Sequence, residues 1–479
     1  MINYVINFKA FLNHRVWHYK FGIMIATNLT IFCEQQFIKS RHMSWLNFFD
    51  TKVEQKHKFG RALDSSLAEN EEELFNQSSE AFEQKEILKA YNLYLKTIEN
   101  FHNGLSNHNI TVSQSEDELN FEIFQGSAKV SGKITNEQLY AESIITKKLS
   151  ASVALKRYVL EKNYQMTYAY YFSDEEYIKL KISHDNTKMT PQKVFYSLRE
   201  LAVNADFDKG YINSIFKDTK VEDTSHLKPL ESSELKIKYD FMHKWITQIE
   251  DKILTYPSND NSAMQSFTLL YLLFKIDYLI TPKYDIYQKI SEKIEEYFSD
   301  ENILVEAKNE ELREYIEKLK EMDFEEFGSN FYYAQYSFNQ SDRASQEEIE
   351  SFINESLVKI RWYKTNRYNL VIPIIYEYIA LYILYIYNLH PVTRKLLHIL
   401  VEIQNPSYFK EIGYATLYDE NGSAFSKRAI TSRIEDAISP YQENFKLLKP
   451  FGDKLNYTSL NEFSNSFYLQ LKNLNFQEI

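Results

Sequence analysis

A long apolar run in the C-terminal half constrains the fold of this chain more than any other feature. It extends from Leu370 to Leu389 and includes "IPIIYEYIALYILYIYNL". A transmembrane helix needs about 20 consecutive, predominantly apolar residues. A helix that is apolar on every side can also form the centre of a large helical bundle. The run is therefore either a membrane span or the buried helix of a soluble helical domain.

The positions of charge and tyrosine favour the buried helix. Glu377 lies near the middle of the run, where a charge inside a bilayer is costly. Five tyrosines are spread over positions 376–387, whereas tyrosine in membrane spans concentrates at the two interfaces. An aliphatic stripe at helical spacing is formed by Ile372, Ile375, Ile379, Ile383 and Ile386. We therefore predict a core helix and keep a span at 370–389 as the alternative.

The composition is typical of a globular protein and not of a nucleic-acid-binding or disulfide-rich one. The 479 residues are 44% hydrophobic and 25% charged, close to the average for globular chains, and the length allows two or three domains. The net charge of −12 argues against nucleic acid as a partner, because such binding needs clustered Lys and Arg. Cys33 is the only cysteine, so we expect no disulfide framework and a cytoplasmic location.

The first residues differ in character from the rest. Basic residues precede an apolar run at 21–33, as in a signal peptide, but three polar residues interrupt this run and no clear cleavage site follows. Met43 opens "MSWLNFFDTK", which reads like a natural bacterial start. We interpret 1–42 as an upstream artefact or a non-domain segment, followed by a polar N-terminal segment at 43–83. A membrane anchor at 17–33 is the alternative.

Residues 84–216 show the pattern of a compact α+β domain. Apolar positions from Leu88 to Ile98 follow helical spacing. Thr190 precedes a proline in the position favoured for the first turn of a helix. Between these helices, alternating apolar and polar residues predict strands within 119–134, 139–146, 164–172 and 177–183. One further helix is predicted at 150–163. The predicted order is helix, three strands, helix, two strands, helix.

This order carries a family resemblance, together with three stretches of sequence. They are "GSAKVSG", "LEKNYQMTYAYYF" and "MTPQKVFYSLRELAVNAD". Over about residues 84–216 the chain resembles the type III secretion chaperone-like fold and, more narrowly, YbjN-type bacterial proteins. Members of this fold class act as chaperones or protein-binding adaptors, commonly through exposed sheet and helix surfaces. The resemblance implies a partner protein but supplies no site motif that can be transferred to individual residues.

The C-terminal half has a helical pattern. A polar linker is predicted at 217–234, and prolines that end helices punctuate the chain after it. Ser345 and Glu348 form a capping-box pattern before an apolar run. No fixed-period repeat is visible. We therefore predict an all-helical domain at 235–479.

No catalytic, cofactor-binding or metal-binding motif with the required residue spacing is found in the sequence. The glycines are too far apart for a nucleotide-binding loop, and CxxC and HExxH are absent. His390 and His398 are too far apart for a metal pair on adjacent helical turns. The stretch 419–425 lacks the ligand alternation of an EF-hand. We therefore expect no catalytic residues, no cofactor and no metal.

These observations lead to three ranked hypotheses. The first is a non-enzymatic chaperone- or adaptor-like module that binds a partner protein through the sheet face of the α+β domain or through a helical groove. The second is a membrane-associated component anchored by 17–33 or 370–389. The third is an enzyme of unrecognised type, which would require a pocket with converging titratable groups.

Overall fold

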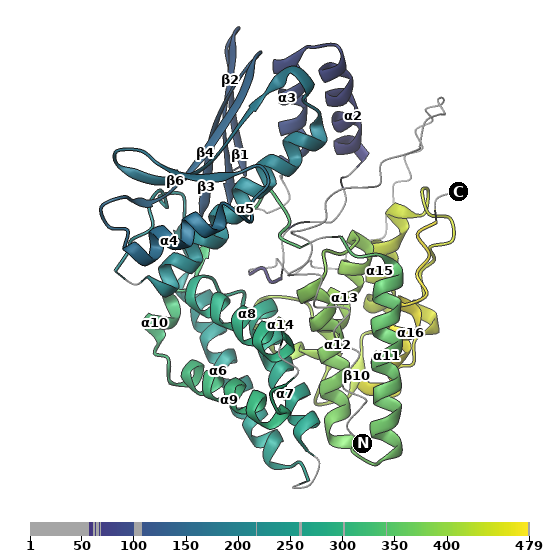
Figure 1. Cartoon of the computed structure of the whole chain (residues 1–479). Coiled ribbons are helices and arrows are strands. Elements are labelled where there is room, and N and C mark those ends of the chain that lie inside the picture. Colours follow the sequence, from purple (N-terminus) through teal and green to yellow (C-terminus); the bar gives the residue numbers. More distant parts are fainter. Residues whose placement is uncertain are drawn as a thin grey trace.

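The computed structural model describes residues 57–60, 63, 67, 69–99, 108–216, 218–257, 261–299, 302–341 and 343–477. The predicted non-domain segment 1–42, the start at Met43 and the candidate anchor 17–33 lie outside the described residues. The chain then builds an N-terminal part around one sheet and a larger, mostly helical C-terminal part (Figure 1). The predicted succession of an α+β part and a helical part is confirmed.

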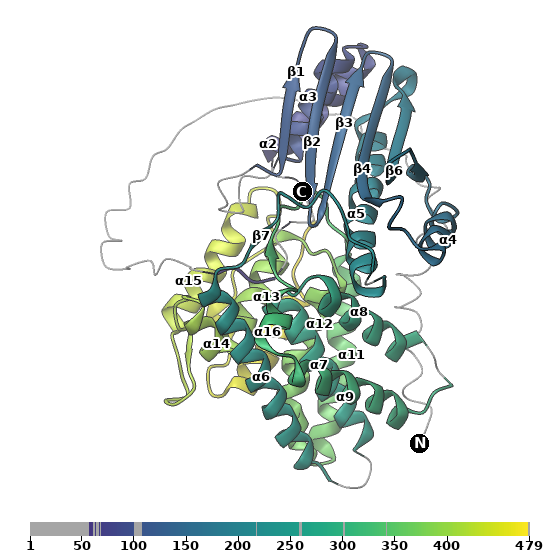
Figure 2. The ribbon, with the colours of Figure 1, turned by 90° about the vertical axis from the view of Figure 1, so that its left-hand side faces the viewer.

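The N-terminal part contains four helices and six strands. In chain order they are α2 (Glu69–Glu83), α3 (Ile87–Thr97), β1 (Ile110–Gln114), β2 (Glu118–Gln125), β3 (Ala128–Thr135), β4 (Gln138–Lys147), α4 (Val153–Lys162), β5 (Tyr170–Ser173), β6 (Tyr177–Asp185) and α5 (Pro191–Ile215). All strands are antiparallel, in the spatial order β1-β2-β3-β4-β6-β5. Helices α3 and α5 lie on one face of this sheet (Figure 2).

Two details of the predicted element order are wrong. Four strands precede α4 where three were predicted. The missing strand is β1, which the sequence pattern does not reveal. Ile110 is its only buried residue, and the rest of the strand is exposed, so an edge strand of this kind lacks the apolar alternation that identifies buried strands. The strand predicted at 164–172 begins only at Tyr170. The backbone N–H groups of Thr167, Tyr168 and Ala169 instead donate to the Glu200 carboxylate.

Local sequence features explain the elements that match their predictions. The Thr190 side chain accepts a hydrogen bond from the Lys193 N–H, and Pro191 occupies the first turn of α5. In β2 the alternate residues Leu119, Phe121 and Ile123 are buried, as a sheet with one covered face requires. Glycine at position 132 lets the ring of Phe121 lie directly against the β3 backbone.

The C-terminal part is a bundle of helices with two short strand pairs. The helices are α6 (Ser232–Leu254), α7 (Ser262–Lys275), α8 (Tyr284–Ser299), α9 (Val305–Glu321), α10 (Phe324–Gly328), α11 (Gln346–Thr365), α12 (Ile372–Ile386), α13 (Pro391–Gln404), α14 (Pro406–Glu411), α15 (Lys427–Ile438) and α16 (Leu460–Leu471). The strand pairs are β7 (Lys228–Pro229) with β8 (Tyr332–Tyr333) and β9 (Tyr418–Asp419) with β10 (Ala424–Phe425). The predicted capping box opens α11.

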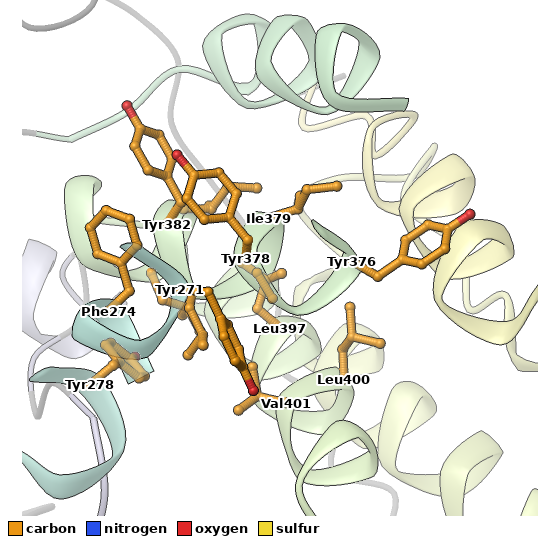
Figure 3. Close-up of a cluster of buried hydrophobic side chains, with 14 of the residues drawn as sticks. Tyr271, Phe274, Tyr278, Tyr376, Tyr378, Ile379, Tyr382, Leu397, Leu400 and Val401 are labelled. Carbon is orange, nitrogen blue, oxygen red and sulfur yellow. The ribbon is translucent and has the colours of Figure 1, made fainter. Parts of the chain in front are cut away.

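The long apolar run forms α12, which is buried among other helices of the C-terminal part. Ile379, at its midpoint, is 0% exposed. The ring centre of Phe274 on α7 lies 5.6 Å from that of Tyr378 and 5.5 Å from that of Tyr382 (Figure 3). It lies 4.9 Å from the ring centre of Tyr385. Among the described residues two helical stretches, Ser262–Ile280 and Asn369–Ile386, are long and apolar enough to cross a membrane, and 78% and 72% of them are buried within the structure.

A polar interface joins the two parts. The Gln125 side chain, at the end of β2, accepts hydrogen bonds from the N–H groups of Ser337 and Phe338, at 3.0 Å and 2.8 Å. It also donates to the Phe338 carbonyl at 3.1 Å. The Phe338 ring belongs to the apolar core of the N-terminal part. The segment around Phe338 therefore holds the helical part against the end of the sheet.

The predicted linker 217–234 also contacts both parts. It contains β7 and the first turn of α6. The ammonium group of Lys209 on α5 is buried and donates to the backbone carbonyls of Ser127, Glu222 and Asp223. Burial lowers the pKa of Lys209 to about 8. The boundary at 217–234 stays a prediction, but these contacts tie the segment to the sheet and to the helical part.

Candidate functional site

One face of the six-stranded sheet has no described helix over it. Figure 2 shows this face toward the viewer, with α2, α3 and α5 behind the strands. Because side chains alternate along a strand, the residues between the buried positions point to this open face. On β2 these include Asn120 and Glu122, which are partly buried by their neighbours. Near the β2–β3 turn the face is covered, since the ring of Phe124 lies 5.1 Å from that of His226.

Most charges on the open face are paired across adjacent strands. Lys129 lies 3.6 Å from Glu122, and Lys133 forms an ion pair with Glu118. Lys179 on β6 lies 2.8 Å from Glu142 on β4 and 2.9 Å from Asp174. Partly exposed pairs of this kind contribute at most about 1 kcal/mol each. Their main effect is to leave much of the open face electrically neutral.

Lys181 is an exception on this face. It forms no ion pair among the described residues, and its ammonium group lies over three aromatic rings. The distances to the ring centres are 4.0 Å for Phe172, 5.2 Å for Tyr170 and 5.8 Å for Tyr140. Strand register brings them together, because Lys181 pairs with Tyr170 on β5 and with Glu142 on β4. We call Tyr140, Tyr170, Phe172 and Lys181 the Lys181 cluster.

The Lys181 cluster has the chemistry of a protein-binding surface. Tyr170 is 40% exposed, so its ring offers apolar area to a partner. The Tyr140 hydroxyl donates to the Glu142 carboxylate at 2.5 Å, and burial together with this carboxylate raises the Tyr140 pKa, so Tyr140 stays neutral. Neutral aromatic rings beside a cation are enriched where proteins bind one another.

The two edges of the sheet differ. At the β5 edge the Tyr171 N–H donates to Asn163 Oδ1 at 2.6 Å, and Asn163 Nδ2 donates to the Tyr171 carbonyl at 3.2 Å. The Asn163 side chain therefore occupies the position that another strand would take. At the opposite edge, no strand in the part of the chain that the structure describes pairs with the outer side of β1. Open edges of this kind can accept a further strand.

Comparison with known proteins adds no assignment. No family model matches this chain, and no curated protein matches its sequence. The candidate site therefore depends on its geometry alone.

The sequence leads us to expect a partner protein on the sheet face, but it identifies no individual residue of that face. It predicts no catalytic, cofactor-binding or metal-binding position. It does predict the hairpin that carries Lys181 and Phe172, and "YIKLKIS" places Lys179 and Lys181 on one side of a strand. Which rings surround Lys181 depends also on the register of this hairpin and on the pairing of β6 with β4, and the sequence does not show either of these. Within the described residues, no group of three or more His, Cys, Asp or Glu side chains could hold a metal ion.

Proposed function

We propose that this protein is a non-enzymatic binding module, chaperone- or adaptor-like, that docks a partner protein on the open face of its sheet. The Lys181 cluster carries the proposal, because it combines exposed aromatic area with a cation that has no carboxylate partner among the described residues. The partner then supplies an acidic side chain for Lys181 and an apolar one for the ring of Tyr170. A charge pair that is shielded from water in this way contributes more than an exposed one.

The contacts at the sheet edges support a docking mode across the face. The β5 edge, which is closest to the Lys181 cluster, is closed by Asn163. A partner segment therefore lies over the side chains of β4, β6 and β5 and does not extend the sheet at that edge. The membrane anchor considered at 370–389 is not proposed, since the surfaces of α12 are occupied by other helices.

Site-specific photo-crosslinking tests this proposal. A photo-reactive phenylalanine analogue replaces Tyr170 on the open face or, as a control, Tyr196 on α5, which is 54% exposed. We expect a discrete protein adduct from position 170 in cells and none of the same mass from position 196. The adduct should disappear when the Lys181→Glu substitution is added. Equal adducts from both positions, or an adduct that is insensitive to Lys181→Glu, would contradict docking on this face.

A further inference from the structure

Helix α4, at the outer edge of the N-terminal part (Figure 1), carries exposed apolar side chains on its outer side. Val153 and Leu160 on the helix are 67% and 62% exposed. Leu149 and Tyr164, in the turns before and after it, are 98% and 94% exposed. Single exposed apolar residues are common on protein surfaces, whereas a group of them on one surface marks an interaction site.

Helical spacing places these side chains opposite the side of α4 that packs on the domain. Val153 and Leu160 are separated by about two helical turns. Tyr164 follows in a turn that continues the helix, since its N–H donates to a carbonyl of the last helical turn. The buried residues of α4, Leu155 and Val159, lie on the other side. Helix α4 therefore has two apolar sides, although folding uses only one of them.

Basic residues flank the exposed apolar side. Lys156 and Arg157 lie between Val153 and Leu160 in the sequence and, at helical spacing, to either side of them. Both are exposed and form no ion pair among the described residues. The whole chain has a net charge of −12, whereas residues 147–164 include five basic residues and one acidic residue. The charge around α4 is therefore opposite in sign to that of the chain and complements an anionic partner.

An acidic turn lies near the start of α4. The ammonium group of Lys148 donates to the Asp174 carbonyl at 2.9 Å, beside two exposed glutamates at 175–176. These acidic residues reduce the positive charge at this end of the surface. The cations that face a partner are therefore chiefly Lys156 and Arg157.

These features fit a lipid surface better than a protein partner. The apolar side chains project from the convex side of a helix, so a protein would need a groove shaped to receive them, whereas lipid molecules rearrange around them. Helices that lie on membranes bury apolar side chains at the headgroup boundary, and Lys and Arg near them attract anionic headgroups. Tyrosine, as at position 164, is enriched at the same depth.

We propose that α4 docks this protein reversibly on the surface of a membrane that contains anionic lipids. The four exposed apolar side chains enter the headgroup boundary, and Lys156 and Arg157 contact the anionic headgroups. The contact is peripheral, so it needs no transmembrane helix. It uses different residues from the Lys181 cluster, so it does not depend on a partner at the sheet face.

Co-sedimentation of the full purified chain with lipid vesicles tests this inference. We expect binding to mixed vesicles of phosphatidylcholine and phosphatidylserine, and at least about fivefold weaker binding to phosphatidylcholine alone. Added salt should weaken binding to the mixed vesicles, because it screens exposed charges. No binding to the mixed vesicles, or equal binding to both kinds, would overturn the inference. A photo-reactive analogue at position 164 that captures a protein in cells, without vesicle binding, would assign the surface to a partner protein instead.

Matched variants test whether α4 is the surface that binds. Leu160→Ser and Lys156→Glu change exposed side chains, so both should fold normally, and each should weaken binding to the mixed vesicles at least about fivefold. Leu447→Ser and Lys446→Glu make the same changes at exposed positions in the helical part and should bind like the unmodified chain. If either α4 variant binds as tightly as the unmodified chain, or if the controls lose as much, the inference is overturned. Leu149→Ser, in the turn before α4, replaces any α4 variant that melts at a lower temperature.

Discussion

The ammonium group of Lys181 lies 4.0 Å from the ring centre of Phe172 on the open face of the sheet. These two residues are on neighbouring strands, and the third and fourth members of the cluster come from β4 and β5. A cation–π contact at an exposed site contributes only about 0.5–1 kcal/mol. The arrangement therefore adds little to folding, and its significance lies in what it presents to a partner.

The first prediction concerns the core helix. Replacing Ile379 with Asp places a carboxylate where the side chain is 0% exposed. We expect a loss of about 3–5 kcal/mol from a free energy of unfolding that is typically 5–15 kcal/mol. Urea denaturation measures this loss. Val358→Asp on α11, at a position that is 54% exposed, is the control and should stay close to the unmodified chain. An unchanged midpoint for Ile379→Asp would show that α12 is not at the centre of the fold.

The second prediction concerns the interface between the two parts. Gln125→Leu leaves the N–H groups of Ser337 and Phe338 and the Phe338 carbonyl without their partner. We expect the unmodified chain to unfold in one calorimetric transition and Gln125→Leu to lose about 2–4 kcal/mol. Gln138→Leu removes one exposed hydrogen bond to Ser183 and should change little. Two well-separated transitions in the unmodified chain would instead favour the independent domains expected from the sequence.

The third prediction is a pH dependence due to His398. Burial, together with Arg394 and Arg433, lowers the pKa of this residue to about 3 from 6.5. Below pH 6.5 the unfolded chain therefore binds a proton that the folded chain does not, and stability is lost as the pH falls from 6.5 toward 3. The loss is at most about 1.4 kcal/mol per pH unit and smaller if water reaches the ring.

Urea denaturation at neutral pH and at about pH 5 measures this dependence. His398→Gln cannot titrate, so it should lose less stability than the unmodified chain over this interval. His108→Gln, at an exposed position, serves as the matched control and should retain the original dependence. A His398→Gln variant that loses as much stability as the unmodified chain would rule out His398 as a source of the effect.

The fourth prediction concerns the closed edge of the sheet. Asn163→Ala removes the side chain that bonds both backbone groups of Tyr171, so the β5 edge becomes available to another strand. We expect concentration-dependent self-association, detected by light scattering. It should be absent in Asn473→Ala, where the changed amide donates to the Leu469 carbonyl in the last turns of α16, the helix just before it. A monodisperse Asn163→Ala protein would show that this edge needs no protection.

The sequence is informative wherever the structure depends on local pattern. The cap at Thr190, the capping box at Ser345 and the apolar run around Ile379 each depend on spacing within a few residues, and the sequence predicts all three. It does not predict the strand β1, because four of its five residues are exposed. An edge strand without a buried stripe has the same pattern as a polar loop.

Contacts between distant elements are long-range in the sequence, which explains why the sequence does not predict them. Tyr271 and Glu377 are 106 residues apart, and Gln125 and Phe338 are 213 residues apart. Periodicity places each side chain on a face of its own element but does not say which element faces it. The position of Glu377 in the sequence is enough to disfavour a membrane span. Its pairing with Lys275 depends on the packing of α7 against α12, which only the structure shows.

The affinity of the crosslinked partner for charge-reversed variants tests the central claim most directly. Once the adduct at position 170 identifies a partner, the dissociation constant of the purified pair is measured for the unmodified chain, Lys181→Glu and Lys156→Glu. Lys156 is an exposed lysine on α4, so it matches the change in charge away from the Lys181 cluster. The account predicts that Lys181→Glu weakens binding at least about tenfold, or 1.4 kcal/mol, while Lys156→Glu leaves it within about twofold. Equal affinities for the two variants would contradict docking on the open sheet face.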